Sequence, residues 1–304
     1  NLANPELAYK VSMLPNSGVG LLREEFIINN YIKVHPLALL GYNNIKDEKV
    51  KKEIDEITVG YTDKKKYFID KLTYGLSTIA TAFRGKDVIV RFSDFKSNEY
   101  YNLLGGSEYE PHEENPMIGW RGASRYYSES YKEAFGLECL AIKRVRKEYG
   151  LKNVIVMLPF VRTVEECQRV LDTMESFGLK RGEDGLKVYI MCEIPSNVIC
   201  AEEFCELVDG FSIGSNDLTQ LTLGLDRDSE LIAHLYNENN IAIKRMLSKV
   251  IKTCKSKGVK IGICGQGPSD SKEFAEFLVK EDIDTISLTP DSIVKTIINL
   301  SKLK

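Results

Sequence analysis

The chain has 304 residues, of which 43% are hydrophobic and 28% charged, and its formal net charge is −3 at pH 7. Charges of both signs are interspersed, which argues against a nucleic-acid or membrane-surface partner. No apolar run approaches the roughly 20 residues that span a bilayer, and the first residues do not form a signal peptide. The seven cysteines include no CxxC pair, so we interpret them as reduced thiols of a cytoplasmic protein.

Short apolar strands alternate with helical patterns along the chain. Helices are expected at 5–14, in two segments between 47 and 83 that break near Gly60, and at 131–149, 163–177, 198–207, 229–257, 271 onward and 291–300. Strands are expected at 19–22, 88–91, 116–119, 154–158, 187–192, 211–213, 260–264 and 285–288. The polar stretch 97–115 is expected to be a long loop.

This alternation predicts the fold. Continuous apolar strands separated by helices imply a parallel sheet with both faces covered. Eight such units favour a closed (β/α)8 TIM barrel with extra N-terminal helices over an open doubly wound sheet. No linker-like stretch interrupts them, so residues 1–304 are expected to form a single domain. The chain does not begin with Met, and we expect it to be a fragment of a longer protein.

The stretch GFSIGSNDLTQ, residues 210–220, combines a strand, a turn and a helix start. The apolar run ends at Gly214, and Ser215 and Asn216 are residue types that cap helices and leave free N–H groups at the helix start. Asp217 adds a carboxylate, a ligand type that Mg²⁺ prefers. The sequence therefore predicts a site for Mg²⁺ and a phosphate, and the alternative is a capped helix with a solvated acid.

Polar residues also follow the other expected strands. They are Arg23, Arg91, Arg121, Glu193, Asn216, Asp217 and Cys264. Because active sites of (β/α)8 barrels lie at the carboxyl ends of the strands, we expect these side chains to share one pocket. Arginines suit a phosphate ester with a carboxylate, Glu193 and Asp217 offer two ligands for one Mg²⁺, and a thiol at Cys264 suits acid–base chemistry. Taken singly, structural ion pairs, a helix cap at Glu193 or a buried hydrophobic thiol at Cys264 remain alternatives.

Six stretches identify a family. They are GVGLLREEFIINN, VIVRFSDFKSNEY, ENPMIGWRGASRYYS, MCEIPSN, GFSIGSNDLTQLTLGLDRDSEL and GICGQGPSD. With them the chain resembles the C-terminal phosphoenolpyruvate (PEP)-binding domain of the PEP-utilising enzymes, in the branch of phosphoenolpyruvate synthase (pyruvate, water dikinase). This family is a (β/α)8 barrel in this region. One departure is Gly267, where the resemblance leads us to expect Ala.

The resemblance implies roles for particular residues. Arg23 and Arg91 correspond to residues that bind substrate phosphate and carboxylate, Arg121 to a further pocket arginine, and Arg227 to an arginine that contacts the phosphoryl group. Glu193 and Asp217 correspond to Mg²⁺ ligands that also lie against the substrate. Gly214, Ser215 and Asn216 correspond to residues that line the substrate, and Cys264 to the acid/base that moves a proton at C3 of the enolate.

The implied overall reaction is ATP + pyruvate + water → AMP + PEP + phosphate, which belongs to gluconeogenesis. No histidine here stands in a phosphohistidine-like context and no Gly-rich nucleotide loop is present. We therefore expect the phosphohistidine and ATP-binding domains to lie outside this chain, and a homodimer by resemblance. The alternatives are the corresponding domain of a phosphotransferase-system enzyme I-like protein and a non-catalytic pyruvate-binding or dimerisation module.

Overall fold

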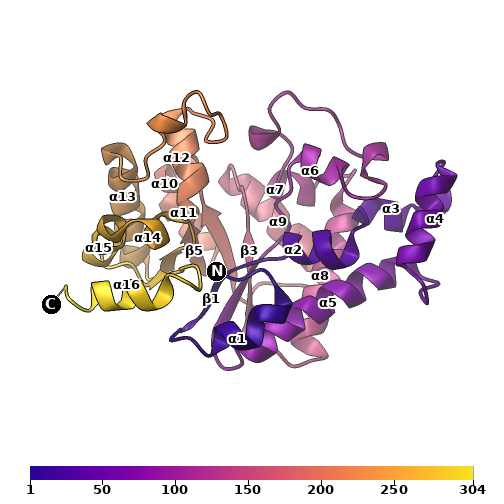
Figure 1. Ribbon diagram of the computed structural model, residues 1–304, viewed down its shortest axis with the longest axis horizontal. Coiled ribbons are helices and arrows are strands. Elements are labelled where there is room, and N and C mark those ends of the chain that lie inside the picture. Colours follow the sequence, from indigo (N-terminus) through magenta and orange to yellow (C-terminus); the bar gives the residue numbers. More distant parts are fainter. Residues whose placement is uncertain (304) are drawn as a thin grey trace.

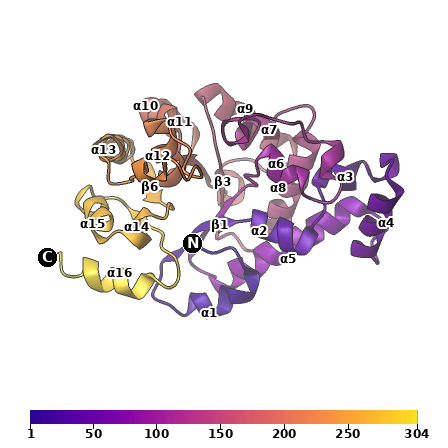
Figure 2. The same ribbon diagram turned by 45° about the horizontal axis from the view of Figure 1, so that its top comes forward.

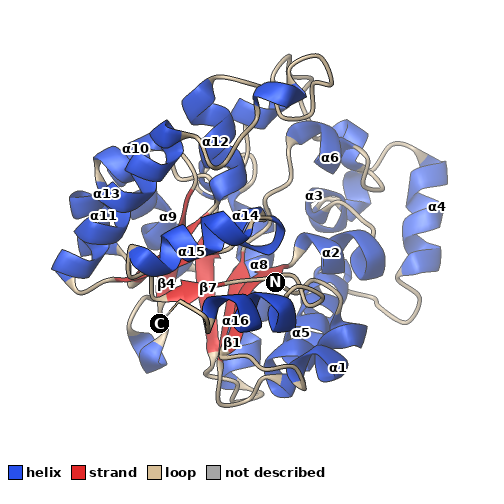
Figure 3. Ribbon diagram, turned by 60° about the vertical axis from the view of Figure 1, so that its left-hand side comes forward, coloured by secondary structure: helices blue, strands red, loops and turns tan. Residues whose placement is uncertain are grey.

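The computed structural model describes residues 1–303, and its centre is one parallel sheet. The strands are β1 Gly18–Arg23, β2 Asp87–Arg91, β3 Val154–Leu158, β4 Val188–Cys192, β5 Gly210–Ile213, β6 Lys260–Ile263 and β7 Thr285–Ile286. Each strand pairs in parallel with the next one along the chain. The helices surround the strands (Figure 3), as the alternation of apolar strands and helices predicts.

The sheet curls into a nearly closed barrel, which confirms the predicted fold class. A Cβ atom on Gly20 of β1 would lie 1.7 Å from the Ser287 hydroxyl oxygen just after β7, so the two edges of the sheet meet. Leu2 forms a parallel bridge with Leu22 of β1, and the Asn1 backbone nitrogen donates to Leu288 O (2.8 Å). Figures 1 and 2 both place the N-terminus beside β1, between the α1–α5 side and α14–α16.

The described residues contain seven strands rather than the eight that were predicted, because the strand expected at 116–119 is wrong. Pro116–Ile118 is a 3-10 helix with the proline at its start, where a fixed φ and a missing N–H are tolerated. Trp120 N donates to the Glu113 carboxylate (2.9 Å) instead of to a neighbouring strand. The last strand is also shorter than predicted, since β7 ends at Ile286.

The helices are mostly those expected from the sequence. They are α1 Ala8–Ser12, α2 Glu25–Ile27, α3 Pro36–Leu40, α4 Glu48–Ile57, α5 Lys64–Ala82, α6 Ser97–Tyr101, α7 Ala123–Tyr126, α8 Lys132–Lys147, α9 Val164–Ser176, α10 Pro195–Ile199, α11 Ala201–Leu207, α12 Ser215–Leu223, α13 Ile241–Lys257, α14 Gly267–Asp270, α15 Lys272–Lys280 and α16 Ile293–Leu300. Two predictions differ: α6 interrupts the expected loop at 97–115, and the helix expected from 229 begins only at Ile241. No helix within residues 1–303 is long and apolar enough to span a lipid bilayer.

The sheet separates two apolar clusters. The larger one fills the space between the outer face of the sheet and the helices. The smaller one lies inside the barrel and consists of Leu21, Ile155, Met157, Tyr189, Met191 and Cys264. Since successive side chains of a strand point to opposite faces, one strand supplies both clusters. The segments 102–120 and 224–240 stand at the top of Figure 1, above the carboxyl ends of the strands.

Candidate active site

A cavity of about 330 Å³ opens at the carboxyl ends of the strands. Its predicted lining residues are Arg23, Arg91, Arg121, Glu193, Gly214, Asn216, Asp217, Arg227 and Cys264. The sheet register places them side by side: Arg23 pairs with Arg91, and the ends of β4, β5 and β6 are neighbours through Cys192, Ile213 and Ile263. The structure therefore brings together nine of the ten predicted residues, and Ser215 lies fully buried behind them.

Three carboxylates converge in this cavity. Asp94, Glu193 and Asp217 each offer an oxygen within 4.8 Å of the other two. Phe160 N donates to Glu193 Oε1 (2.7 Å), from a backbone with φ of +51°, and left-handed non-glycine residues of this kind concentrate at functional sites. Burial, followed by the charges of Asp217 and Asp94, raises the pKa of Glu193 to about 8.

The carboxylate cluster fits a hard divalent cation. Within residues 1–303, the buried Asp217 Oδ1 has no hydrogen-bond partner. An unpaired buried acceptor destabilises the fold unless a ligand satisfies it. All three acids offer oxygen, the ligand type that Mg²⁺ requires. A cation would pair with Asp217 Oδ1 and offset the repulsion that raises the pKa of Glu193.

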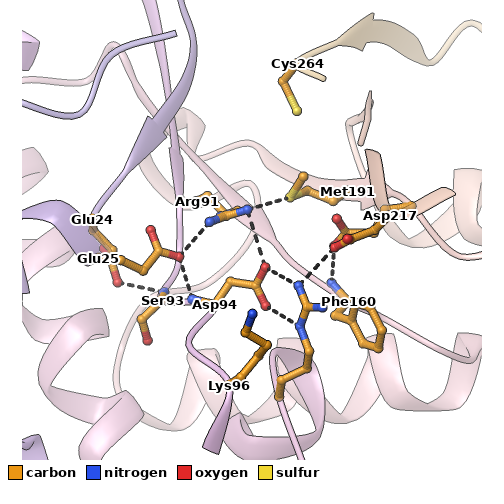
Figure 4. A network of polar contacts seen from close by, with 12 residues as sticks. Glu24, Glu25, Arg91, Ser93, Asp94, Lys96, Phe160, Met191, Asp217 and Cys264 are labelled. Carbon is orange, nitrogen blue, oxygen red and sulfur yellow. Dashed lines mark hydrogen bonds and ion pairs between the residues drawn. The ribbon is translucent and has the colours of Figure 1, made fainter. Parts of the chain in front are cut away.

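The buried Arg121 and the half-buried Arg91 both contact this cluster. Figure 4 shows Arg91 beside Asp94. Arg121 binds Asp94 bidentately (3.0 and 2.8 Å) and also reaches Asp217 Oδ2 (3.0 Å). Arg91 donates to Glu25 Oε1 (2.8 Å) and lies 3.4 Å from Asp94 Oδ2. Burial disfavours both charged guanidinium groups, but the surrounding carboxylates outweigh it and raise the pKa of Arg91 and Arg121.

The other two arginines lie toward solvent. Arg23 is exposed at the end of β1. Arg227 lies on the segment after α12, one-third exposed, with its Nη1 3.8 Å from Asp217 Oδ1. Within residues 1–303 both line the cavity without a carboxylate at hydrogen-bond distance, so their guanidinium groups can bind an incoming anion.

Cys264 forms part of the cavity floor, directly after β6. Its thiol donates to Ile213 O (3.5 Å), and only 4% of the residue is exposed. Burial, together with the Glu193 carboxylate, raises the pKa of the thiol to about 11, while Arg91 and Ser212 act in the opposite direction. At neutral pH the group is therefore a thiol, a potential proton donor.

The helix start at 214–217 differs in detail from the prediction. The N-cap of α12 is Gly214, and neither Ser215 nor Asn216 caps the helix with its side chain. Asn216 Oδ1 instead accepts from Gln266 N (3.1 Å), which ties α12 to the turn after β6. A Cβ atom on residue 214 would lie 2.9 Å from Glu193 Cβ and Oε2, so only glycine leaves Glu193 in place.

Several residues that line the cavity or contact its arginines were not predicted, although the sequence marks some of them. Asp94 and Glu25 each come within three residues of a strand end, and that position is the clue that applied to Glu193. Lys96 and Met117 also line the cavity. They come from the segment that folds back over the barrel after β2, for which strand-end positions give no guide.

Comparisons with known proteins agree with this geometry. The family model described as "PEP-utilising enzyme, PEP-binding domain" matches residues 1–304. The chain belongs to this family.

Curated relatives in the PEP-utilising enzyme family are named phosphoenolpyruvate synthase. The protein of Synechocystis is 59% identical over 100% of this chain and 37% of its own length. Those of Aquifex aeolicus and Escherichia coli are each 53% identical over 100% of this chain, and 41% and 38% of their own lengths are covered. The chain thus spans about two-fifths of the length of these relatives, and the region matched includes the whole cavity.

Proposed function

We propose that this chain is the pyruvate- and PEP-binding barrel of a phosphoenolpyruvate synthase. The whole enzyme would convert ATP, pyruvate and water into AMP, PEP and phosphate. One observation carries the proposal: three carboxylates within 4.8 Å of one another share a cavity with four arginines and one thiol. The names and identities of the curated relatives support the same reaction.

Glu193 and Asp217 would hold Mg²⁺, and the approach of Asp94 makes it a third candidate ligand. Bound Mg²⁺ would supply positive charge where the enolate oxygen of pyruvate becomes negative. The unpaired Asp217 Oδ1 supports this assignment, because a cation would give that oxygen a partner.

The arginines would bind and orient the substrate. Arg23 and Arg227 stand at the rim without a hydrogen-bonded carboxylate in the described part of the chain, and Arg91 and Arg121 are fixed by their own carboxylates. Such preorganised cations stabilise developing negative charge without reorganising during the reaction. Gly214 and Asn216 would line the opposite wall of the pocket at the start of α12, with Ser215 buried behind them.

Cys264 would transfer the proton at C3. As a thiol it is suited to protonating the enolate in the direction of pyruvate. In the direction of PEP the thiolate removes a methyl proton, and the nearby Arg91 favours that form. The enolate oxygen would then take the phosphoryl group from a phosphohistidine domain of the same full-length protein, in a cytoplasmic homodimer.

The exchange of pyruvate methyl protons tests this function directly. The chain with Mg²⁺ and pyruvate in D₂O is expected to show deuterium incorporation by NMR, and Cys264→Ala is expected to abolish it. Cys192→Ala is the matched control, since this thiol precedes Glu193 but faces the outer core. Exchange that persists in Cys264→Ala, or that does not depend on Mg²⁺, would contradict the assignment.

A further inference from the structure

Two glutamates lie fully buried beneath the cavity. Glu24 follows β1, Glu138 comes from α8, and both are 0% exposed. They converge on the same backbone amide: Ser93 N donates to Glu24 Oε1 (3.0 Å) and to Glu138 Oε2 (3.1 Å). The Ser93 hydroxyl also donates to Glu138 Oε1 (2.6 Å). Glu24 and Ser93 are visible at the left of Figure 4.

The pair holds one proton. Both carboxyl groups are fully buried and accept from the same Ser93 N–H, so the uncharged form of one of them is favoured. Burial raises the pKa of both groups, and the neighbouring Glu138 raises that of Glu24 further. Two like charges this close in an apolar surrounding would otherwise repel strongly.

The hydrogen-bond directions place the proton on Glu24. Glu138 is the end of a chain of donors, because the Tyr131 hydroxyl donates to Tyr100 (2.6 Å) and the Tyr100 hydroxyl lies 2.7 Å from Ser93 Oγ. Ser93 Oγ already donates to Glu138, so Tyr100 donates to Ser93. Glu24, by contrast, accepts only at Oε1, and its Oε2 has no hydrogen-bond partner within residues 1–303. Glu138 is therefore the carboxylate and Glu24 the acid.

The groups around the pair keep it in this state. Those that face it are Glu25, Tyr100, Tyr126, Tyr131 and Cys139, and Arg125 lies beyond Tyr100 and Tyr131. Burial raises the pKa of the three tyrosines and of the Cys139 thiol well above their usual values. They therefore stay neutral, and Glu138 carries the charge of the Glu24–Glu138 pair.

The pair is connected to the substrate site through two adjacent amides. Glu24 accepts from Ser93 N, and Glu25 accepts from Asp94 N (2.6 Å) and from Arg91 Nη2 (2.8 Å). Two consecutive acids after β1 thus fix the turn after β2, from which Arg91 and Asp94 reach the cavity. Loss of either acceptor would free a buried N–H and allow this turn to shift.

We propose that Glu24 and Glu138 form an acid–carboxylate pair that acts as a positioning device for Arg91 and Asp94. The proposal rests on the function assigned above only where it names the substrate. Among the described residues that line the cavity, neither member of the pair is present, so both are positioning residues.

Paired substitutions of Glu24 test the proposal. In Glu24→Gln the amide can donate to Glu138 and accept from Ser93 N, which reproduces the protonated acid. Its affinity for PEP with Mg²⁺, measured by calorimetry, is expected to stay within about twofold of the unsubstituted chain. Glu24→Leu removes both bonds, and its affinity is expected to fall by about tenfold or more, in line with about 1.4 kcal/mol per tenfold change. A tenfold loss in Glu24→Gln, or equal affinity in Glu24→Leu, overturns the positioning role.

Two readouts do not depend on any ligand. In a Glu193→Gln background, the infrared carbonyl stretch of a protonated carboxylic acid is expected at pH 7 and should vanish when Glu24→Gln is added; its absence, or its survival in that double variant, overturns the assignment of the proton. Glu193→Gln serves as a control for the other buried acid with a raised pKa. Amide hydrogen exchange at Ser93 and Asp94 should be faster in Glu24→Leu than in Glu24→Gln, and equal rates contradict the proposal. If no variant binds PEP, the proposed function fails while these two measurements still decide the pair.

The pH dependence of stability has a definite sign. The folded pKa of Glu24 lies above its unfolded value, so its contribution is fully present below the usual pKa of a glutamate, near 4.5. The contribution is lost as the pH rises through the folded pKa. Glu24→Gln has no such proton, and its unfolding free energy in urea is expected to fall less steeply toward alkaline pH. An equally steep fall would count against a proton held by Glu24.

Discussion

Arg121 and Arg125 lie four residues apart and make similar contacts in different surroundings. Both bind a carboxylate bidentately, Arg121 with Asp94 and Arg125 with Glu110. Both guanidinium groups stack on aromatic rings, 4.1 Å from Phe160 and 4.1 Å from Trp120 respectively. Arg121, however, lines the cavity, whereas Arg125 is 0% exposed and sealed among aromatic side chains.

The hydrogen bonds of the two clusters separate their roles. In the Arg125 cluster, Glu110 accepts from Arg125 and from His35 Nε2 (3.0 Å), and His35 Nδ1 accepts from Leu37 N (3.2 Å). Every polar atom there has a partner. Beside Arg121, by contrast, Asp217 Oδ1 and Arg91 Nε have none within residues 1–303. A sealed and satisfied cluster stabilises the fold, while an open one with unpaired atoms is suited to a ligand.

The largest expected effect is on stability, at the sealed cluster. Arg125→Met leaves Glu110 buried without its cation, and breaking such a pair costs about 3–5 kcal/mol. We expect a loss of this size in the unfolding free energy, measured by urea denaturation with circular dichroism.

The matched variant is Arg121→Met, at the open cluster. Water and Mg²⁺ can reach the carboxylates that it leaves, so its loss is expected to be smaller, and added Mg²⁺ should reverse part of it. An equal loss in the two variants, unaffected by Mg²⁺, would mean that both clusters are structural.

The second expected effect is on binding, where Arg121→Met is expected to lose more than Arg125→Met. Arg121→Met removes charge-assisted hydrogen bonds at the cavity, worth about 1.5–3 kcal/mol, which corresponds to a decrease of about 10–100-fold in affinity for PEP with Mg²⁺. Arg125→Met, measured where it is folded, should bind within a few-fold of the unsubstituted chain. Calorimetry at one pH and salt concentration decides between them.

Much of the barrel was predictable because the residues of each strand are enough to identify it. Runs such as Val154–Leu158 and Val188–Cys192 are fully buried on both faces, so they are apolar throughout. The segment 116–119 has the same apolar character, but its shape is fixed by Pro116 and by the distant Glu113 carboxylate. Only the tertiary fold supplies that second contact. That residues 1–304 form a single domain stays a prediction.

The site was predictable where residues directly follow strands. Glu193 and Cys264 come immediately after β4 and β6, and a barrel brings such positions together. Glu138 was out of reach, because it lies in the middle of an amphipathic helix whose pattern implies an exposed acid. Lys96 and Met117 reach the cavity from a segment that folds back over it. The chemical roles of all the site residues stay predictions.

The smallest expected effect is on the reactivity of two thiols, one in the open cavity and one in the sealed core. Cys264 lines the open cavity, whereas Cys139 is 0% exposed beside Glu138. Alkylation requires the thiolate, so Cys264, whose pKa is raised to about 11, should react slowly with iodoacetamide at pH 7. Its rate should rise about tenfold per pH unit as the thiolate fraction grows. Cys139 combines a raised pKa with a sealed position and should react only on unfolding.

Mass spectrometry of the labelled peptides separates the two sites, and PEP with Mg²⁺ should slow only the alkylation of Cys264. A flat pH profile at Cys264 would mean that access rather than ionisation limits the reaction. Equal labelling of Cys139 would mean that the core around Glu138 is open to solvent.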